Sequence, residues 1–217
     1  MELDLSPREL LTTTRTVRKR LDLTRPVPRE SVEECLRLAF QAPNGSDQQT
    51  WNWVVVDDPS TRSDMAAIYM QALQDHINRP RTKPSDARPP QTPKQQRMTE
   101  SVMYLMEHLA EVPVLVVPTF HGRCERGTVF EQASRWGSIV PAVWSFMLAL
   151  RLHAMGSAWT TLHLYREQEM AELLGIPYET ETQAGLFPVA FTIGTEFKVA
   201  DRSASEQRIH WNRWTPS

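Results

Sequence analysis

The chain has 217 residues, a hydrophobic share of 41%, a charged share of 23% and a formal net charge of −2. This length suits one domain with a substantial core, and a sequence pI near 6.3 argues against general nucleic-acid binding. No apolar run approaches the about 20 residues of a membrane span, and the N-terminus MELDLSPREL lacks the features of a signal peptide. We therefore expect a cytoplasmic protein that binds neither nucleic acid nor a membrane.

The first third of the chain predicts helices and one strand, each marked by apolar residues at regular spacing. Ser6 and Glu9 form a capping box around Pro7, which is typical of a helix start. The expected elements are a helix from Ser6 that ends among residues 12–14, a helix within 28–43 that ends at the signals Pro43, Asn44 and Gly45, a strand over 51–58, and a helix whose apolar face spans 65–73.

A polar stretch, residues 78–97, holds five prolines, six Lys/Arg and no large apolar residue. Such a segment cannot form a core, so we expect a surface loop or lid-like insertion that closes over a pocket and attracts acidic substrates. The alternative is a disordered linker between two domains, which is less favoured because neither half of the chain alone looks able to close a core.

The rest of the chain predicts further helices and strands and then a tail. The expected elements are a helix around 102–109, a buried strand over 112–120, a long helix over 136–148, a strand at 157–162, a short helix over 166–175, and a last strand over 187–194. The long helix is apolar over much of its circumference and should be buried from more than one side. The tail, 195–217, carries Trp211 and Trp214 and needs a surface to cover them, for example a second copy of the chain.

Several common chemical motifs are missing from the sequence. It contains no G-x-G-x-x-G after a strand, no phosphate-loop signature and no G-x-S-x-G elbow. Its six histidines show no metal-ligand spacing, so we expect no metal site. Cys35 and Cys124 are too few for a disulfide framework, and Cys35 on an apolar helix face reads as a buried thiol.

Two polar segments remain as candidates for a binding site. Arg15, Thr16 and Arg18 can converge on one phosphate, because guanidinium groups offer paired donors and the hydroxyl adds a neutral one. The loop APNGSDQQTW, 42–51, offers backbone and amide groups able to recognise a heterocycle. A solvated basic turn and an ordinary polar connection are the respective alternatives.

Taken together, these segments resemble the FMN-dependent nitroreductase family. The family's R-x-[ST]-x-R-like motif and D-x-P-V-P stretch correspond to TRTVRKRLDLTRPVP, and its A-P-S-G-x-N-x-Q-P-W corresponds to APNGSDQQTW. Its G-L-G-[ST]-x-W corresponds to MGSAW, and its final R-x-P-x-x-x-x-x-H-W to RSASEQRIHW from Arg202. The matches run from residue 3 to about 214 in the expected order.

The resemblance implies a single α+β domain over 1–217, with a central mixed sheet flanked by helices. It implies a homodimer in which the 195–217 tail wraps the partner. It also implies two FMN sites at the dimer interface, each built from one group of residues in this chain and a second group in the other subunit. Arg15, Thr16, Arg18 and Arg202 would hold the phosphate and ribityl chain, Trp159, Thr160, Thr161 and Leu162 would lie beside the flavin ring, and Pro43, Asn44, Gly45, Asp47 and Gln49 would approach the ring from the other subunit.

The implied activity is transfer of electrons from NADH or NADPH through the flavin to a nitroaromatic, quinone or related acceptor, by a ping-pong mechanism. The basic segment 78–97 would then also attract the phosphates of NADPH. No side chain is assigned a catalytic role. Asp47 replaces the family's usual asparagine, and the Thr160–Leu162 run replaces a glycine-richer one. The alternatives are a biosynthetic reduction, a dehydrogenation or a reductive dehalogenation on the same fold, a deazaflavin as donor, or a protein that only sequesters FMN.

Overall fold

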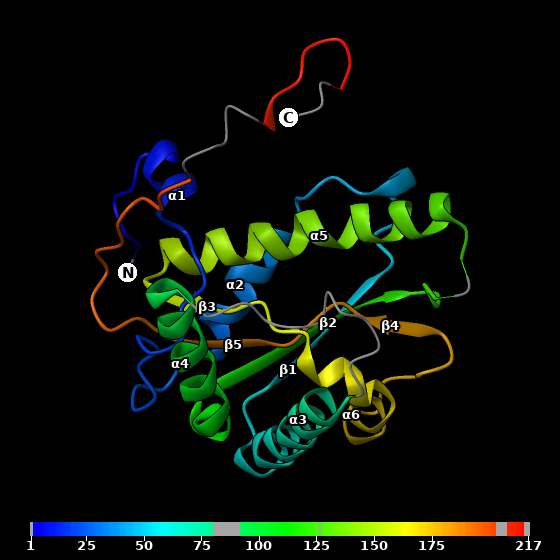
Figure 1. The fold of residues 1–217 in the computed structure, drawn as a ribbon, viewed down its shortest axis with the longest axis horizontal. Helices are drawn as coiled ribbons and strands as arrows, with labels where there is room; N and C mark the ends of the chain where they lie inside the picture. The colour runs from blue at the N-terminus through cyan, green and yellow to red at the C-terminus, as the bar shows by residue number, and fades with distance from the viewer. Residues whose placement is uncertain (1, 80–91, 126, 203–207, 215–217) are drawn as a thin grey trace.

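A computed structural model describes residues 2–79, 92–125, 127–202 and 208–214. At its centre lies an antiparallel sheet in the order β1-β2-β5-β3, with β4 also paired to β2 (Figure 1). The strands are β1 (Trp51–Val56), β2 (Val114–His121), β3 (Met155–Ser157), β4 (Glu181–Gln183) and β5 (Phe187–Phe191). The expected α+β class is confirmed, but every pairing between described strands is antiparallel, so the sheet of this chain is not mixed.

Helices cover both faces of this sheet, which gives three layers (Figure 1). The α-helices are α1 (Pro7–Thr13), α2 (Arg29–Ala39), α3 (Pro59–Asn78), α4 (Pro93–Glu107), α5 (Val129–Leu152) and α6 (Glu167–Leu174). Short 3₁₀ turns are η1 (Gly45–Asp47), η3 (Leu109–Glu111) and η4 (Leu162–Arg166). No described helix is both long enough and apolar enough to cross a bilayer.

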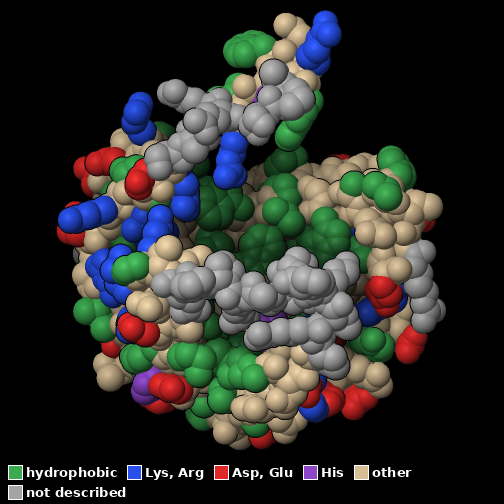
Figure 2. Space-filling model, viewed as in Figure 1, with side chains coloured by type: hydrophobic (Ala, Val, Ile, Leu, Met, Phe, Trp, Pro, Cys, Tyr) green, Lys and Arg blue, Asp and Glu red, His purple; other side chains and the backbone are tan. Residues whose placement is uncertain are grey.

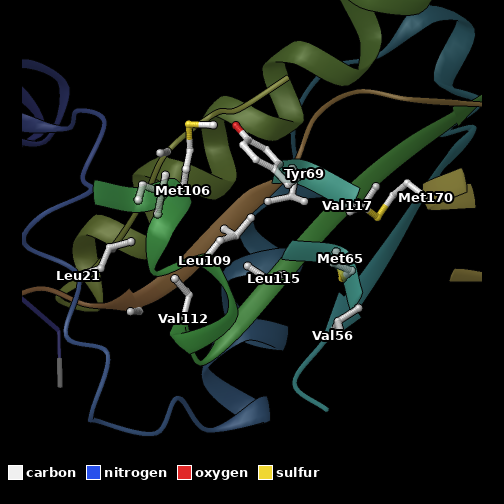
Figure 3. Close-up of a cluster of buried hydrophobic side chains, with 14 of the residues drawn as sticks. Leu21, Val56, Met65, Tyr69, Met106, Leu109, Val112, Leu115, Val117 and Met170 are labelled. Atoms are coloured by element: carbon white, nitrogen blue, oxygen red, sulfur yellow. The ribbon is translucent and has the colours of Figure 1, made fainter. Parts of the chain in front are cut away.

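The central strand β2 is apolar from Val114 to Pro118, where both of its faces are covered. Val114 and Val116 belong to a core shared with α2 and α5, whereas Leu115 and Val117 belong to a core shared with α3 and α6. Successive side chains of a strand point to opposite faces, so one apolar run supplies two cores. Figure 3 shows the second core, in which Leu115 lies among residues from α3, α4 and η3. The predicted buried strand is thereby confirmed.

Local signals fix the ends of α1 and α6 where the sequence predicts them, whereas α2 ends at Ala39, before the predicted stop at residues 43–45. The capping box of Ser6 and Glu9 is present, and α1 ends at Thr13, within the predicted limits. Helix α6 ends at Gly175, whose left-handed backbone (φ +67°) suits glycine. Cys35 is fully buried, as predicted, and burial raises the pKa of its thiol to about 12. Both cysteines are free.

The prediction of a loop throughout 78–97 is wrong at its C-terminal end. Helix α4 begins at Pro93, and a second capping box, formed by Thr92 and Gln95, satisfies its first backbone donors. The hydrophilic composition hid this start, because the apolar face of α4 begins only at Met98. Residues 80–91, the rest of the predicted loop, lie outside the described residues.

The predicted strand at 157–162 is also wrong. The backbone after α5 turns sharply at Ala154 (φ +57°), and the strand is β3, only three residues long. Thr160 then forms an isolated bridge with Leu186 before the chain enters η4. The polar strand β4 escapes sequence detection because a strand of three residues is too short to show alternation.

Residues 208–214 of the tail lie away from the body of the protein (Figure 1). Residues 208–214 form no helix longer than one turn and extend away from the layers (Figure 1). Trp211 and Trp214 are 83% and 79% exposed in the single chain. The expectation that a partner chain covers them stays a prediction.

Arg20 joins the two ends of the chain. Its guanidinium donates to three backbone carbonyls, those of Ile193 (2.8 Å), Gly194 (2.8 Å) and Glu196 (2.9 Å). It also lies 4.1 Å from the ring of Phe197, which Arg151 approaches to 4.8 Å. The segment after β5 is therefore held against the residues that follow α1.

We expect Arg20→Lys to lower the free energy of unfolding by about 1–3 kcal/mol, because a lysine cannot reproduce a fork of three hydrogen bonds. Lys19→Gln is the matched control, since Lys19 makes only a long, exposed contact of 3.8 Å with Glu100, and such pairs contribute about 0–1 kcal/mol. Urea unfolding measures both. Equal midpoints for the two variants would contradict the role of Arg20.

Candidate functional site

The basic stretch after α1 divides into residues with different roles. Arg20 is used for structure and Lys19 lies near Glu100 at the surface. Arg15 and Arg18 instead line a cavity of about 880 Å³, which we call the basic cavity. Thr16 lines it too.

The basic cavity collects cations from three parts of the chain. Its charged lining residues are Arg15, Arg18, Lys94, Arg97 and Arg202. No carboxylate is among its described lining residues, and none of the five cations forms an ion pair with a described residue. Arg202 reaches this cavity because Arg20 holds the segment that precedes it. Uncompensated positive charge of this kind favours an anionic ligand.

The floor and sides of the basic cavity are apolar. Trp144 and Met147 come from α5, Met98 from α4, and Trp159 from the segment after β3. Figure 2 shows a hollow on this face in which hydrophobic side chains gather, with Lys and Arg side chains along one edge. A ligand here would meet charge on one side and aromatic surface on the other.

A second cavity of about 640 Å³, which we call the apolar cavity, adjoins the first. The two share Arg18, Met98 and Trp159. It lies between α3, α4 and η4, and its lining is largely apolar, with Tyr69 on one side and Thr160, Thr161 and Leu162 on another. At these volumes each cavity is in the range of small-molecule sites.

Trp159 and Thr160 are fixed at the cavities by the link between β4 and β5. The Trp159 indole donates to the carbonyl of Ala184 (3.0 Å). Thr160 exchanges two backbone hydrogen bonds with Leu186, and its hydroxyl donates to the same carbonyl (2.7 Å). Gly185 is required beside them, because a Cβ at this position would lie 2.6 Å from the indole nitrogen and its φ is +152°.

Positive charge extends beneath the basic cavity. Burial lowers the pKa of Arg18, while the nearby Tyr69 raises it, and arginine stays charged despite such shifts. Below Arg15 lies a pocket of about 10 Å³ that Arg151 and Ser157 also line. Arg151 is 6% exposed, and its Nε and Nη1 have no hydrogen-bond partner among the described residues; the same holds for the Ser157 hydroxyl. This buried cation strengthens the field at Arg15.

Comparison with known proteins identifies the family. The model of the Nitroreductase family matches residues 11–191. The chain belongs to the nitroreductase family. A search of curated proteins found no match to this sequence.

Solved structures share the nitroreductase fold at low sequence identity. One is an oxidised iodotyrosine deiodinase bound to FMN and 3-iodo-L-tyrosine, with a TM-score of 0.71, 18% identity and coverage of 95% of this chain and 99% of that chain. A BluB-like flavoprotein from Clostridium difficile 630 has a TM-score of 0.70, 16% identity and coverage of 96% and 100%. The FMN-dependent nitroreductase NfnB from Mycobacterium smegmatis, in complex with NADPH, has a TM-score of 0.66, 17% identity and coverage of 96% and 97%.

The structure brings together one of the two groups of residues that the resemblance to nitroreductases implies. The residues of this group that line the two cavities are Arg15, Thr16, Arg18, Trp159, Thr160, Thr161, Leu162 and Arg202. Their assignment to a flavin stays a prediction, because geometry alone does not identify the ligand.

The other group lies elsewhere in this nitroreductase chain. Its members, which line neither cavity, are Pro43, Asn44, Gly45, Asp47 and Gln49. They surround η1, where the backbone of Gly45 donates to Ser138 of α5 (2.9 Å). Ser138 precedes Trp144 by six residues, which is about 9 Å along a helix axis.

Sequence reasoning missed the contribution of α3 to the cavities and the helix on which Lys94 and Arg97 lie. Lys94 and Arg97 were part of the predicted loop, and their helix is signalled only by the Thr92 capping box. His76 and Tyr165 line the apolar cavity as a hydrogen-bonded pair (3.0 Å), although 89 residues separate them in sequence. No cluster of three or more metal-ligating side chains occurs among the described residues.

A buried histidine beside the apolar cavity makes stability depend on pH. His163 of η4 is fully buried, and burial lowers its pKa to about 4, compared with 6.5 for an exposed histidine. The unfolded chain binds a proton at this residue between pH 6.5 and 4, whereas the folded chain does not. The free energy of unfolding should therefore fall by up to about 3 kcal/mol as the pH drops through this window.

Urea unfolding at several pH values measures the effect. His163→Leu should flatten the pH dependence between pH 6.5 and 4, and an NMR titration of the wild-type His163 ring reports its pKa directly if this variant does not fold. An unchanged pH dependence in the variant, or ring titration near pH 6.5, would contradict the assignment.

Proposed function

We propose that this member of the nitroreductase family is an FMN-dependent oxidoreductase. It carries electrons from NADH or NADPH to a nitroaromatic, a quinone or a related electron-poor acceptor. The observation that supports this most is the pair of joined cavities, which meet at Arg18 and Trp159; one is apolar, and the other is basic with no carboxylate among its described lining residues. The FMN and NADPH named for solved structures of the same fold agree with it.

The basic cavity fits the phosphate end of FMN. A phosphate monoester carries about −1.5 to −2 charges at neutral pH, and Arg15, Arg18 and Arg202 supply three positive charges from both ends of the chain. Their guanidinium groups can each donate two parallel hydrogen bonds to phosphate oxygens. The buried Arg151, which lines a small pocket together with Arg15, adds to the positive potential.

The apolar cavity fits an aromatic ring system. Trp159 is held in a fixed orientation by Ala184, and Thr160 by Leu186, so this wall is formed before a ligand arrives. A rigid, largely apolar wall with a few polar groups is what a flat heterocycle requires. The backbone of Thr161 and Leu162 is the proposed partner of the flavin edge.

The protein's role in the reaction is binding, orientation and exclusion of water. FMN, when bound, supplies the capacity to accept and release a hydride or electrons. Arg15, Arg18 and Arg202 hold the charged end, and Trp159 fixes the depth at which a ring can lie. The nicotinamide donor and the acceptor would use the same open face in turn, so no permanent dinucleotide-binding motif is needed. No side chain is assigned proton transfer.

A second copy of the chain would complete the site. Large apolar side chains of α5 and of the tail are exposed in the single chain, among them Phe130 (80%), Trp144 (38%) and Trp211 (83%). Burying such a surface favours association. We propose that the partner's η1 loop, with Asn44, Asp47 and Gln49, then faces the flavin ring, and that the tail covers the partner. Light scattering of the purified protein should give twice the mass of one chain.

The direct test is the colour of the purified protein and its reduction by NADPH. The double variant Arg15→Ala/Arg18→Ala should bind FMN at least about a hundredfold more weakly, because two charge-assisted contacts of about 1.5–3 kcal/mol each are lost. Fluorescence titration of the apoprotein with FMN measures this affinity.

Lys19→Gln serves as the control, since Lys19 belongs to the same basic stretch but does not line the basic cavity. It should bind FMN within about threefold of the wild type. Acceptors to compare include a nitroaromatic, a quinone and a halogenated tyrosine. A colourless protein that takes up no FMN would falsify the proposed function, and a holoprotein that turns over none of these acceptors would limit it to flavin sequestration.

A further inference from the structure

The basic cavity holds more positive charge than an FMN phosphate needs. Arg15, Arg18 and Arg202 already exceed the about −1.5 to −2 charges of a phosphate monoester. Lys94 and Arg97 add two further charges on the α4 side of the same cavity. Since neither forms an ion pair with a described residue, this second pair is free to bind another anion.

The helix itself gives no reason for these two cations. They lie in the first and second turns of α4 (Pro93–Glu107), and positive side chains near a helix N-terminus oppose the helix dipole, at a typical cost of about 0.3–1 kcal/mol. The start of the helix is already stabilised by Thr92 and Gln95, whose side chains accept from each other's backbone N–H. Binding of an anionic ligand explains the presence of Lys94 and Arg97, whereas helix formation does not.

The position of Lys94 and Arg97 indicates which kind of ligand they bind. Met98 follows Arg97 directly and lines both cavities, so the pair borders the region where the basic and apolar cavities join. A molecule whose reactive ring lies beside Trp159 can therefore extend toward α4. The anionic group that Lys94 and Arg97 bind must therefore lie on a part of this molecule other than its reactive ring.

We infer that Lys94 and Arg97 bind the 2′-phosphate of NADPH and make NADPH, not NADH, the preferred electron donor. This inference rests on the proposed function. NADPH and NADH differ only by that phosphate, a dianion that a lysine and an arginine can neutralise together. Because both side chains are exposed, the preference should weaken as ionic strength rises, since salt screens exposed charges.

The test uses the FMN-loaded protein and the double variant Lys94→Gln/Arg97→Gln. We expect kcat/KM for NADPH to fall about tenfold, whereas kcat/KM for NADH stays within about twofold. Binding provides a readout without electron transfer. The fragment 2′,5′-ADP should quench the fluorescence of the wild-type holoprotein, where Trp144 and Trp159 line the basic cavity, at lower concentration than 5′-AMP does. The double variant should lose this difference.

Lys198→Gln is the matched control, because Lys198 is exposed and does not line the basic cavity. An equal loss in this control, or an equal loss for NADPH and NADH in the double variant, overturns the inference. So does an FMN affinity of the double variant that falls as far as that of Arg15→Ala/Arg18→Ala, since the pair would then bind the flavin phosphate.

Two further outcomes also overturn the inference. The first is a loss confined to carboxylated acceptors, which would assign the pair to the acceptor. The second is a yellow wild-type enzyme that uses NADH and NADPH equally, which leaves the proposed function intact. A wild-type protein that binds no FMN contradicts the proposed function itself. Failure of the inference and failure of the proposed function are therefore distinguishable.

Discussion

The site depends on the contact between the Arg20 guanidinium and the segment that follows β5. Three hydrogen bonds and the ring of Phe197 hold residues 193–197 against the chain that follows α1. Because of this contact, Arg202 lines the same cavity as Arg15 and Arg18 although nearly the whole sequence separates them. Arg20 does not line the basic cavity, but it holds the segment that leads to Arg202.

A second feature of the protein is the set of cations around the basic cavity that form no ion pair with a described residue. Several arginines elsewhere on the chain pair with carboxylates; Arg123 with Glu167 and Arg166 with Asp75 are examples. Around the basic cavity the cations have no such partner among the described residues, and the Nε and Nη1 of the buried Arg151 have no hydrogen-bond partner among them. The burial of Arg151 without these hydrogen bonds is costly for folding. The cost is consistent with a site that is complete only with an anion bound.

The predicted and observed sites differ where tertiary contacts outweigh local patterns. Arg15, Arg18 and Trp159 could be named from sequence because they lie in short motifs whose order matches the nitroreductase family. Lys94 and Arg97 could not, because their surroundings are hydrophilic and no apolar periodicity marks the start of α4. His76 and Tyr165 lie in different elements, and only the packing of α3 against η4 brings them within hydrogen-bond distance.

The sequence by itself determined the class of fold, the order of most elements and the family, because apolar periodicity, capping residues and ordered motifs are local properties of the chain. It also identified the arginines near the N-terminus as a candidate anion site. Only the tertiary structure decided which of those arginines face the cavity and which hold the C-terminal segment. It alone joined the basic and apolar cavities at Trp159, since cavity walls are made by side chains that are distant in sequence and meet only when the helices pack on the sheet.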